Sequence, residues 1–600
     1  MGYPTVFPTG VLVYNKEKAY NGYTIYPSAK GALLIDMNGN EVNLWAGLGG
    51  FPNKILPGGY VMGTTGERGG KYAYQDQLDL VQVDYDGNIV WKFDHTELIA
   101  DPGKEPTWQA RQHHDYQREG NTVGYYYPGG EPKTDSGNTI ILTHENVYNH
   151  EISDKKLIDD KIIEVDWEGN ILWSWRASDH FEEFDFDEAA KNVLFRNPGL
   201  HGEAGGDWMH INCVSVLGEN KWYDAGDERF HPDNLIFDAR NANILAIISK
   251  KTGEIVWQIG PDFSKTKELR KLGWIIGQHH FHMIPKGLPG EGNLMVFDNG
   301  GWGGYGTPNP SSPIGVKNAL RDYSRVLEFN PVTLEVVWKL TPKELGHAIP
   351  TDASKFYSPY VSSAQRLPNG NTLVTEGSDG RLIEVTPDHE IVWEWISPYY
   401  THNEKGPRNN MIYRAYRYPY SYVPQEPVPV EVPIERIDNV TYRVPGAGAF
   451  GAKKVIDVEG TLPYYQDVAL CVATDDEEDL SQREKVFEVD TQVFHPADAA
   501  SWKDEVLAVE DKPVLVLFGA ERCVHCKALH PVLEEALKEE YDGAYEIRYV
   551  DVDANQDLVD TYNVGGIPVV VIFRNGKEVL RFNGEMDYDD LCDILDRPLG

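Results

Sequence analysis

Basic residues, cysteines and long apolar runs are all scarce in this chain of 600 residues. Lysine and arginine together number 55 against 93 aspartate and glutamate residues, which gives a formal net charge of -38. Because such a charge repels nucleic acid and anionic membranes, neither is expected as a partner. An anionic substrate would need a local positive site. The acidic residues are spread along the chain, with a dense patch from Asp475 to Asp479, and we interpret them mainly as a source of solubility.

No run of about 18 apolar residues is present, so the sequence predicts no membrane span. The start, MGYPTVFPTG, lacks the basic and then apolar pattern of a signal peptide. We expect a periplasmic or secreted location if a signal has been removed, and a cytoplasmic location otherwise. Of the five cysteines, Cys213, Cys471 and Cys592 show no pairing pattern, whereas the other two stand together in CVHC.

What the chain does contain is one repeated phrase, a turn followed by a strand with tryptophan. An alternating apolar run enters a Gly, Asn or Asp turn and leaves through a second alternating run, which is typical of a β-hairpin. The six copies are 46, 82, 84, 81 and 55 residues apart and end at Trp45, Trp91, Trp173, Trp257, Trp338 and Trp393. This spacing predicts a six-bladed β-propeller with loop insertions of different length.

The length predicts at least two domains, since one core rarely serves 600 residues, and 41% apolar residues suffice for globular cores. We assign residues 1–422 to the propeller and residues 491–600 to a small α/β domain. Residues 423–490 begin with a proline-rich linker or extended segment. The strand-like pieces at 440–444 and 468–472 either extend the propeller or bridge the domains. The expected fold class is therefore mainly β with a small α/β domain after it.

The last hundred residues carry a specific order of features. An apolar strand pattern at 514–518 leads into Cys523-Val524-His525-Cys526 and an amphipathic helix pattern, and Gly566-Ile567-Pro568 precedes a strand pattern at 569–573. This order resembles the thioredoxin fold. The resemblance implies a redox-active disulfide in which Cys523 attacks, Cys526 resolves and Pro568 is a cis-proline that faces the pair.

Two positions depart from the thioredoxin pattern. Leu517 stands where the family carries a buried aspartate, and His525 within the motif resembles oxidising or isomerising members more than reductants. A thiol or disulfide of another protein is one expected partner of this domain. The alternative, a plain disulfide or unused thiols on a docking domain, stays open.

Six histidines fall at matching places in three repeats. Alignment of the repeats puts RQHHD and GQHHFHM at the same place in two blades, with His113 opposite His280, and DWMHIN in a blade between them. Because the inner strands of a propeller line its channel, equivalent residues converge on the axis. In each His-His pair, strand alternation directs one side chain inward and the other into the blade. The set is His113, His114, His210, His279, His280 and His282.

Many long phrases between residues 10 and 420 resemble the arylsulfotransferase family, the aryl-sulfate sulfotransferases that use no nucleotide sulfate donor. Among them are AYNGYTIYPS, DWMHINCVSVL, FHPDNLIFDARNANILAIISKKTGEIVWQIGPDF, IIGQHHFHMIPKG, LMVFDNGG and SSAQRLPNGNTLVTEGSDGRLIEVTP. The resemblance implies a six-bladed propeller that moves a sulfuryl group from an aryl sulfate donor to a phenolic acceptor. Transfer runs through a sulfated histidine in the channel, with no cofactor or metal.

The motifs of that family place the nucleophile at His280 and the sulfate-binding and acid/base positions at His210 and Arg240. One of His113 and His114 is a further active-site histidine, and the motif leaves open which. Neutral imidazole is a nucleophile near neutral pH, and a guanidinium offers a forked donor to sulfate oxygens. The remaining candidates for substrate binding are His279, His282 and Arg325, the last of which has a structural role as its alternative.

Two other functions compete with sulfuryl transfer. Several axial histidines could bind iron, copper or zinc, and His280 and His282, two apart on one strand face, have spacing suitable for two ligands. Alternatively, the propeller is a recognition module whose channel binds a ligand without catalysis, and the redox domain is its effector.

Overall fold

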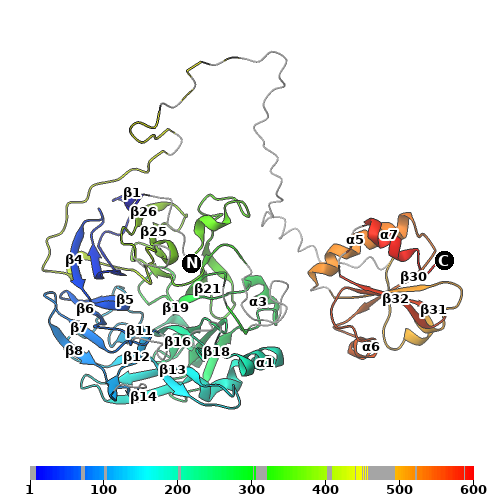
Figure 1. Ribbon diagram of the computed structural model, residues 1–600, viewed down its shortest axis with the longest axis horizontal. Helices are drawn as coiled ribbons and strands as arrows, with labels where there is room; N and C mark the ends of the chain where they lie inside the picture. The colour runs from blue at the N-terminus through cyan, green and yellow to red at the C-terminus, as the bar shows by residue number, and fades with distance from the viewer. Residues whose placement is uncertain are drawn as a thin grey trace. The chain divides into compact units, whose positions relative to one another are not determined.

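The computed structural model describes two compact units, residues 1–472 and residues 473–600 (Figure 1). The described residues are 8–599 except 69–74, 101–104, 200–204, 302, 306–320, 402–408, 439–440, 449–450, 452, 455, 457–492, 521–522, 585 and 587. The strand-like piece at 468–472 and Cys471 lie outside them, and residues 441–444 form no strand.

The first unit is a six-bladed β-propeller, as the repeats predict. Each blade is an antiparallel sheet, and in blades 2 to 5 the strands follow one another in chain order from the channel outward. Figure 1 shows the blades arranged around a centre. Blades 2 to 5 each hold four strands. Blade 2 consists of β5 (Gly49–Leu56), β6 (Tyr60–Thr64), β7 (Leu80–Val83) and β8 (Ile89–Phe93), and blade 3 of β11 (Gln112–Arg118), β12 (Thr139–Val147), β13 (Leu157–Val165) and β14 (Ile171–Arg176). Blade 4 consists of β15 (Ile211–Val216), β16 (Leu235–Ala239), β17 (Ile244–Ile248) and β18 (Ile255–Ile259), and blade 5 of β19 (His279–Met283), β20 (Leu294–Asp298), β21 (Arg325–Phe329) and β22 (Val336–Leu340).

Blades 1 and 6 join the two ends of this unit and close the ring. In blade 1 the late strand β27 (Tyr416–Tyr418) pairs with β2 (Tyr23–Ser28), and β3 (Gly31–Ile35) and β4 (Glu41–Ala46) follow. In blade 6 the early strand β1 (Gly10–Tyr14) pairs with the outermost strand. The other strands of blade 6 are β23 (Ser363–Arg366), β24 (Thr372–Glu376), β25 (Arg381–Val385) and β26 (Ile391–Ile396).

The repeated tryptophans connect each blade to the next one. Each lies on an outer strand, and its indole N–H donates to a backbone carbonyl in the hairpin turn of the following blade, over 2.8 to 3.1 Å. The sixth, Trp393, donates to Met37 in blade 1, so the series returns to its start. The repeat is conspicuous in the sequence because every blade boundary needs the same donor and the same turn. The six donor and acceptor pairs are Trp45–Tyr85, Trp91–Trp167, Trp173–Lys250, Trp257–Pro331, Trp338–Pro387 and Trp393–Met37.

Loop insertions between blades, and one within blade 4, carry the short helices of this unit. Asp187 caps α1 (Glu188–Arg196) by accepting the N–H of Ala190, which satisfies one of the unpaired donors of the first turn. The other insertions hold α2 (Lys221–Asp224), α3 (Lys267–Leu272) and a two-stranded sheet of β9 (Glu97–Ile99) and β10 (Thr107–Gln109).

The second unit is an α/β domain with the predicted thioredoxin-like order. Its sheet has the strand order β28 (His495–Pro496), β30 (Glu546–Asp551), β29 (Val514–Gly519), β31 (Val569–Arg574) and β32 (Lys577–Asn583). β29 pairs with β30 in parallel and with β31 in antiparallel orientation, and the helices are α5 (Val524–Glu539), α6 (Gln556–Thr561) and α7 (Tyr588–Leu595). The apolar run that predicts β29 is buried because helix side chains pack on it.

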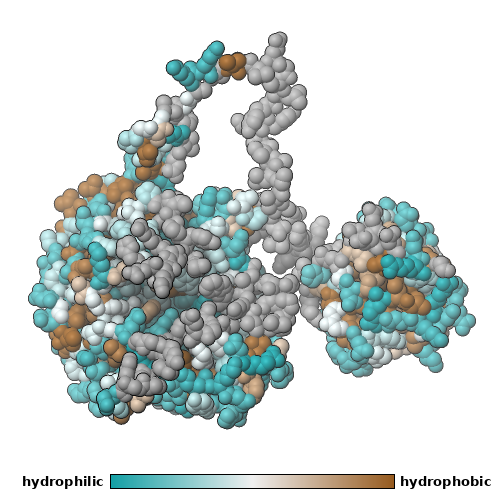
Figure 2. All heavy atoms as spheres, in the orientation of Figure 1, coloured by the Kyte–Doolittle hydropathy of each residue, from teal (hydrophilic) through white to brown (hydrophobic). Residues whose placement is uncertain are grey.

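Hydrophilic residues cover most of the face that Figure 2 shows, on both units, in agreement with the acidic composition. Within the part of the chain that the structure describes, no helix has the length and apolarity needed to cross a membrane.

Candidate functional site

A cavity of about 240 Å³ lies at the start of the inner strands of the propeller, and three of the six predicted histidines meet there. His114, His210, Arg240 and His279 all line it, although they come from three different blades. Each of the four side chains is buried, at most 6% exposed. Aromatic and apolar side chains complete the described lining: Phe51, Tyr360, Val361, Met411 and Tyr413, together with Gln75.

Backbone strain concentrates around this cavity. His114 and His210 have φ near +54°, in the left-handed region that residues other than glycine seldom adopt, and so do Gln75 and Val361. Each inner strand with a histidine has an irregular register near that residue, which is typical of a β-bulge. Strain of this kind persists only where the surrounding structure enforces it, and it is common at functional sites.

The bulges change the predicted equivalence of the histidines. Among the six histidines, His114, His210 and His280 have left-handed backbone conformations, so His114 rather than His113 corresponds to His280. In blade 5, however, His279 lines the cavity and His280 does not. Regular alternation along a strand cannot resolve this difference, because one extra residue in a bulge reverses which side chain faces the channel.

His279 is held by hydrogen bonds on one edge of its ring. Its Nδ1 lies 2.8 Å from Asn299 Oδ1 and 3.1 Å from the carbonyl of Gly277, which leaves Nε2 as the nitrogen available to the cavity. Burial, and then the charge of Arg240, hold the pKa of His279 well below its ordinary value. The ring is therefore neutral at physiological pH.

His280 and His282 lie in a different part of the channel. His280 Nε2 is 3.2 Å from the hydroxyl of Tyr416, and burial followed by the charge of Arg414 lowers its pKa. Both ring nitrogens of His282 are hydrogen-bonded, to the carbonyl of His280 and to the hydroxyl of Tyr125. His282 therefore has no ring nitrogen without a partner, whereas His280 Nδ1 is buried and makes no hydrogen bond to any residue that the structure describes.

His210 forms a pair with a carboxylate. Its Nδ1 lies 2.6 Å from Asp207 Oδ2, so this pair holds a hydrogen on Nδ1, and the His210 side chain lines the cavity. Arg240 borders the same space, and its Nη1 donates to Asn241 Oδ1 at 3.1 Å. Arg240 supplies the local positive charge that an anionic substrate requires in so acidic a protein.

Behind His114 lies a buried polar cluster that the sequence analysis did not predict. His114 Nδ1 is 2.8 Å from His113 Nδ1, and the ring of His113 stacks on His144 with 3.6 Å between centroids. His144 in turn bonds Asp76, and Asp160 Oδ1 lies 3.3 Å from His113 Nε2. His113 therefore supports His114 from behind rather than lining the cavity. His144 lies in β12 and belongs to none of the sequence motifs, so the sequence gives no signal that singles it out.

His113, His144 and Asp160 are the one group among the described residues whose ligand-type atoms lie within 4.8 Å of one another. The two imidazole rings are stacked with their planes 14° apart, so their lone pairs lie in two nearly parallel planes. A metal ion needs lone pairs that converge on one point. His113 Nε2, His144 Nε2 and Asp160 Oδ1 are nevertheless buried without a hydrogen-bond partner among the described residues, so metal binding stays the alternative for this group.

Arg325 does not reach the cavity. Its guanidinium is ion-paired to Asp298 over 2.7 Å and donates to the carbonyl of Trp274. The structural alternative that the sequence left open for this residue is the one that the contacts support.

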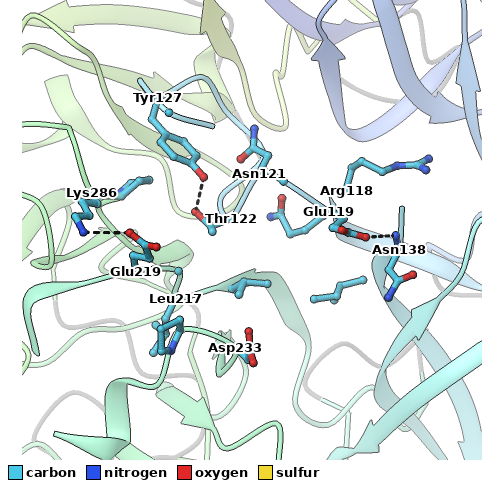
Figure 3. A pocket seen from close by; sticks show the side chains of 18 of the residues that line it. Arg118, Glu119, Asn121, Thr122, Tyr127, Asn138, Leu217, Glu219, Asp233 and Lys286 are labelled. Carbon is cyan, nitrogen blue, oxygen red and sulfur yellow. Dashed lines mark hydrogen bonds and ion pairs between the residues drawn. The ribbon is translucent and has the colours of Figure 1, made fainter. Parts of the chain in front are cut away.

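A second and larger cavity, of about 630 Å³, lies at the other ends of β11 and β15 (Figure 3). Figure 3 shows Lys286 paired to Glu219 across it, and Glu119 bonded to the backbone of Asn138. It contains none of the predicted site residues. Some of its polar side chains are paired, whereas Arg118 Nε and Nη2 are buried without a hydrogen-bond partner in the described part of the chain.

In the second unit, Cys523 and Cys526 form a disulfide at the start of α5. Cys523 is the N-cap of the helix, and its sulfur accepts the N–H of Cys526 at 3.0 Å. The Ile567–Pro568 peptide bond is cis, and the Ile567 carbonyl lies 3.5 Å from the Cys523 sulfur. The predicted redox residues are thus side by side. Leu517 is buried at the position of the missing aspartate.

Fold and site together define a β-propeller with a histidine-lined and arginine-lined channel site, joined to a thioredoxin-fold domain. Comparison with known families agrees. Residues 131–414 match the arylsulfotransferase (ASST) family model, and residues 493–597 match the thioredoxin model. The propeller thus carries an arylsulfotransferase-family domain and the C-terminal unit belongs to the thioredoxin family, which supports a sulfotransferase enzyme fused to a thioredoxin domain.

Thioredoxins are among the related curated proteins. The chain is 36% identical over 97 residues to thioredoxin of Pseudomonas aeruginosa, which is 16% of this chain and 88% of that protein. It is 37% identical over 91 residues to thioredoxin of Staphylococcus epidermidis, 15% of this chain and 86% of that protein. It is 34% identical over 104 residues to chloroplastic thioredoxin M-type of Triticum aestivum, 17% of this chain but only 58% of that protein.

Proposed function

We propose that the propeller transfers a sulfuryl group from an aryl sulfate to a phenol through a sulfated His279. The observation that carries the proposal is the cavity itself, in which a neutral imidazole, a second imidazole paired to a carboxylate, and an arginine face one another. His279 replaces His280 as the nucleophile because His279 borders this cavity.

In the first half-reaction, the lone pair of His279 Nε2 attacks sulfur and the bond from sulfur to the aryl oxygen breaks. The electron pair of that bond goes to the phenolic oxygen, which takes a proton from the imidazolium form of His210 at Nε2. Asp207 stabilises that imidazolium through its bond to Nδ1. The product is an N-sulfonated His279 whose Nδ1 keeps its hydrogen.

In the second half-reaction, neutral His210 takes the proton of the acceptor phenol. The phenolic oxygen attacks sulfur, the bond between nitrogen and sulfur breaks, and its electron pair returns to His279 Nε2. Arg240 binds the sulfuryl oxygens in both half-reactions. Its permanent positive charge stabilises the negative charge that shifts during transfer. The site thus returns to its starting protonation state.

The walls of the cavity suit an aromatic substrate. Phe51 and Tyr413 pack edge to face with 4.8 Å between ring centroids, and Tyr360 lies in the same lining. A planar ring inserted there would gain aromatic contacts and exclude water from the reacting atoms. We therefore infer a phenolic acceptor and an aryl sulfate donor.

The proposal is tested by trapping the intermediate. The protein is mixed with 4-nitrophenyl sulfate without an acceptor, and nitrophenol release and intact mass are followed. We expect a burst of one equivalent of nitrophenol and a gain of one SO₃ group, which added phenol removes. Steady release of free sulfate without a sulfated protein would contradict the proposal.

We further propose that Cys523 and Cys526 exchange thiols and disulfides with a partner protein. The macrodipole of α5 favours the Cys523 thiolate, and the cis-proline loop borders the sulfur. Reduction of insulin disulfides by the dithiol form should disappear in Cys523→Ser. An unchanged rate in that variant would leave the disulfide a structural feature.

A further inference from the structure

The hydrogen-bond network behind His279 is directional. Asn299 follows β20 directly and is completely buried. Its side-chain nitrogen donates to two backbone carbonyls, those of Ser358 at 2.6 Å and Val361 at 2.9 Å. Since carbonyl oxygens only accept, the atom that faces them is the NH₂ group, and the amide oxygen must face His279.

The orientation of this amide decides which nitrogen of His279 carries the hydrogen. The Asn299 oxygen, 2.8 Å from Nδ1, is an acceptor, and the second neighbour of Nδ1 is the Gly277 carbonyl, also an acceptor. Two acceptors at one ring nitrogen require a hydrogen on that nitrogen. A neutral imidazole with its hydrogen on Nδ1 has its only lone pair on Nε2.

We propose that Asn299 is a positioning residue that keeps the hydrogen of His279 on Nδ1, so that the lone pair of Nε2 points into the cavity. Its catalytic consequence rests on the proposed function, but the assignment of the hydrogen does not. The same amide ties the nucleophile to the wall of the cavity, because Val361 and its neighbour Tyr360 line it. Asn299 thus fixes the nucleophile and the substrate wall with one side chain.

Substitutions of Asn299 separate positioning from folding. In Asn299→Leu the ring loses its better acceptor, the hydrogen moves in part to Nε2, and kcat for nitrophenol release falls about tenfold, the equivalent of one lost hydrogen bond. In Asn299→Asp the acceptor is kept with a negative charge that favours imidazolium, so the acid limb of the kcat profile moves to higher pH.

A matched control exists in blade 4. Asn220 is also buried and donates to two backbone carbonyls, those of Gly218 and Phe230, while its oxygen accepts backbone N–H groups. Like Asn299→Asp, Asn220→Asp removes two hydrogen bonds that a side-chain amide donates to backbone carbonyls. Asn220, however, lies outside the histidine cavity. We expect it to leave the pH profile in place.

The deciding measurement is nitrogen-15 NMR of the histidine side chains in the full chain, with His279 assigned by the loss of its signals in His279→Gln. We expect the hydrogen of His279 on Nδ1 in the parent, and also in Asn299→Asp at a pH above the pKa of His279. In Asn299→Leu we expect part of the population to carry the hydrogen on Nε2. The same tautomer and the same kcat in Asn299→Leu would overturn the inference. If no aryl sulfate is turned over, the proposed function fails, while the tautomer shift still decides the role of Asn299; if Asn299→Leu does not fold, the pH profile of Asn299→Asp decides it.

Discussion

Three histidines and one arginine line the histidine cavity, and the partner of each histidine distinguishes its role. Amide and carbonyl oxygens hold His279, a carboxylate holds His210, and another imidazole holds His114. An acceptor without charge keeps an imidazole neutral and nucleophilic, whereas a carboxylate stabilises its protonated form. The nucleophile and the acid/base residue are thereby distinguished although both are histidines.

Replacement of Arg240 by lysine tests the role of the cation. A lysine keeps the charge but loses the planar fork that matches two sulfuryl oxygens, so we expect kcat/KM for 4-nitrophenyl sulfate to fall about a hundredfold. Arg325→Lys is the control, because Arg325 is also a largely buried arginine but lies outside the cavity. Equal losses in the two variants would show that the effect of Arg240 is structural.

At the scale of the element, the bond from each tryptophan to the next hairpin turn couples neighbouring blades. A blade cannot tilt away from its neighbour without breaking this bond, and the cavity needs side chains of three blades in register. Blades 1 and 6 are coupled in addition because β27 pairs with β2 in blade 1 and β1 pairs with β26 in blade 6.

We expect Trp257→Phe to lower the free energy of unfolding of the propeller by about 1 to 3 kcal/mol. The change keeps an aromatic ring but removes the buried bond to Pro331 and leaves that carbonyl without its donor. Trp338→Phe, whose equivalent bond is exposed, should cost less because water replaces the indole. Urea denaturation of both variants measures the difference, and equal costs would mean that burial of this bond is unimportant.

The order of the elements was predictable from the sequence, whereas the inner edge of the channel was not. The six turns with tryptophan predict the blades because one interaction repeats at every boundary, and the CVHC strand and helix predict the second unit. The choice between His279 and His280 depends on a bulge of one residue, for which neither side chain gives a signal. Asn299 lies within the family-like phrase LMVFDNGG, so a reading of that phrase for polar partners could have found it.

At the scale of the whole molecule, a protein with a net charge of -38 also buries several carboxylates in its propeller. Burial raises the pKa of Asp238 to about 7 and that of Asp159 to about 6. A carboxyl whose pKa is higher in the folded than in the unfolded state stabilises the fold at low pH, and this contribution is lost as pH rises through the folded value. Asp76 behaves oppositely, because His144 and Arg111 hold its pKa near 2 against the effect of burial.

Asp238→Asn isolates this effect. The free energy of unfolding of the variant relative to the parent should rise by on the order of 2 kcal/mol between about pH 5 and about pH 8, since only the parent must ionise a buried carboxyl. An asparagine oxygen can still accept from the Cys213 thiol and the Phe281 N–H. A difference that does not change with pH would show that Asp238 ionises as readily in the folded protein as in the unfolded chain.

The central claim, that His279 carries the sulfuryl group, is tested most directly by comparing two neighbouring residues. Acceptor-dependent release of nitrophenol from 4-nitrophenyl sulfate is measured for the parent, His279→Gln and His280→Gln. The geometry of the cavity predicts that release disappears in His279→Gln and persists in His280→Gln. Release that persists in His279→Gln and disappears in His280→Gln would contradict it.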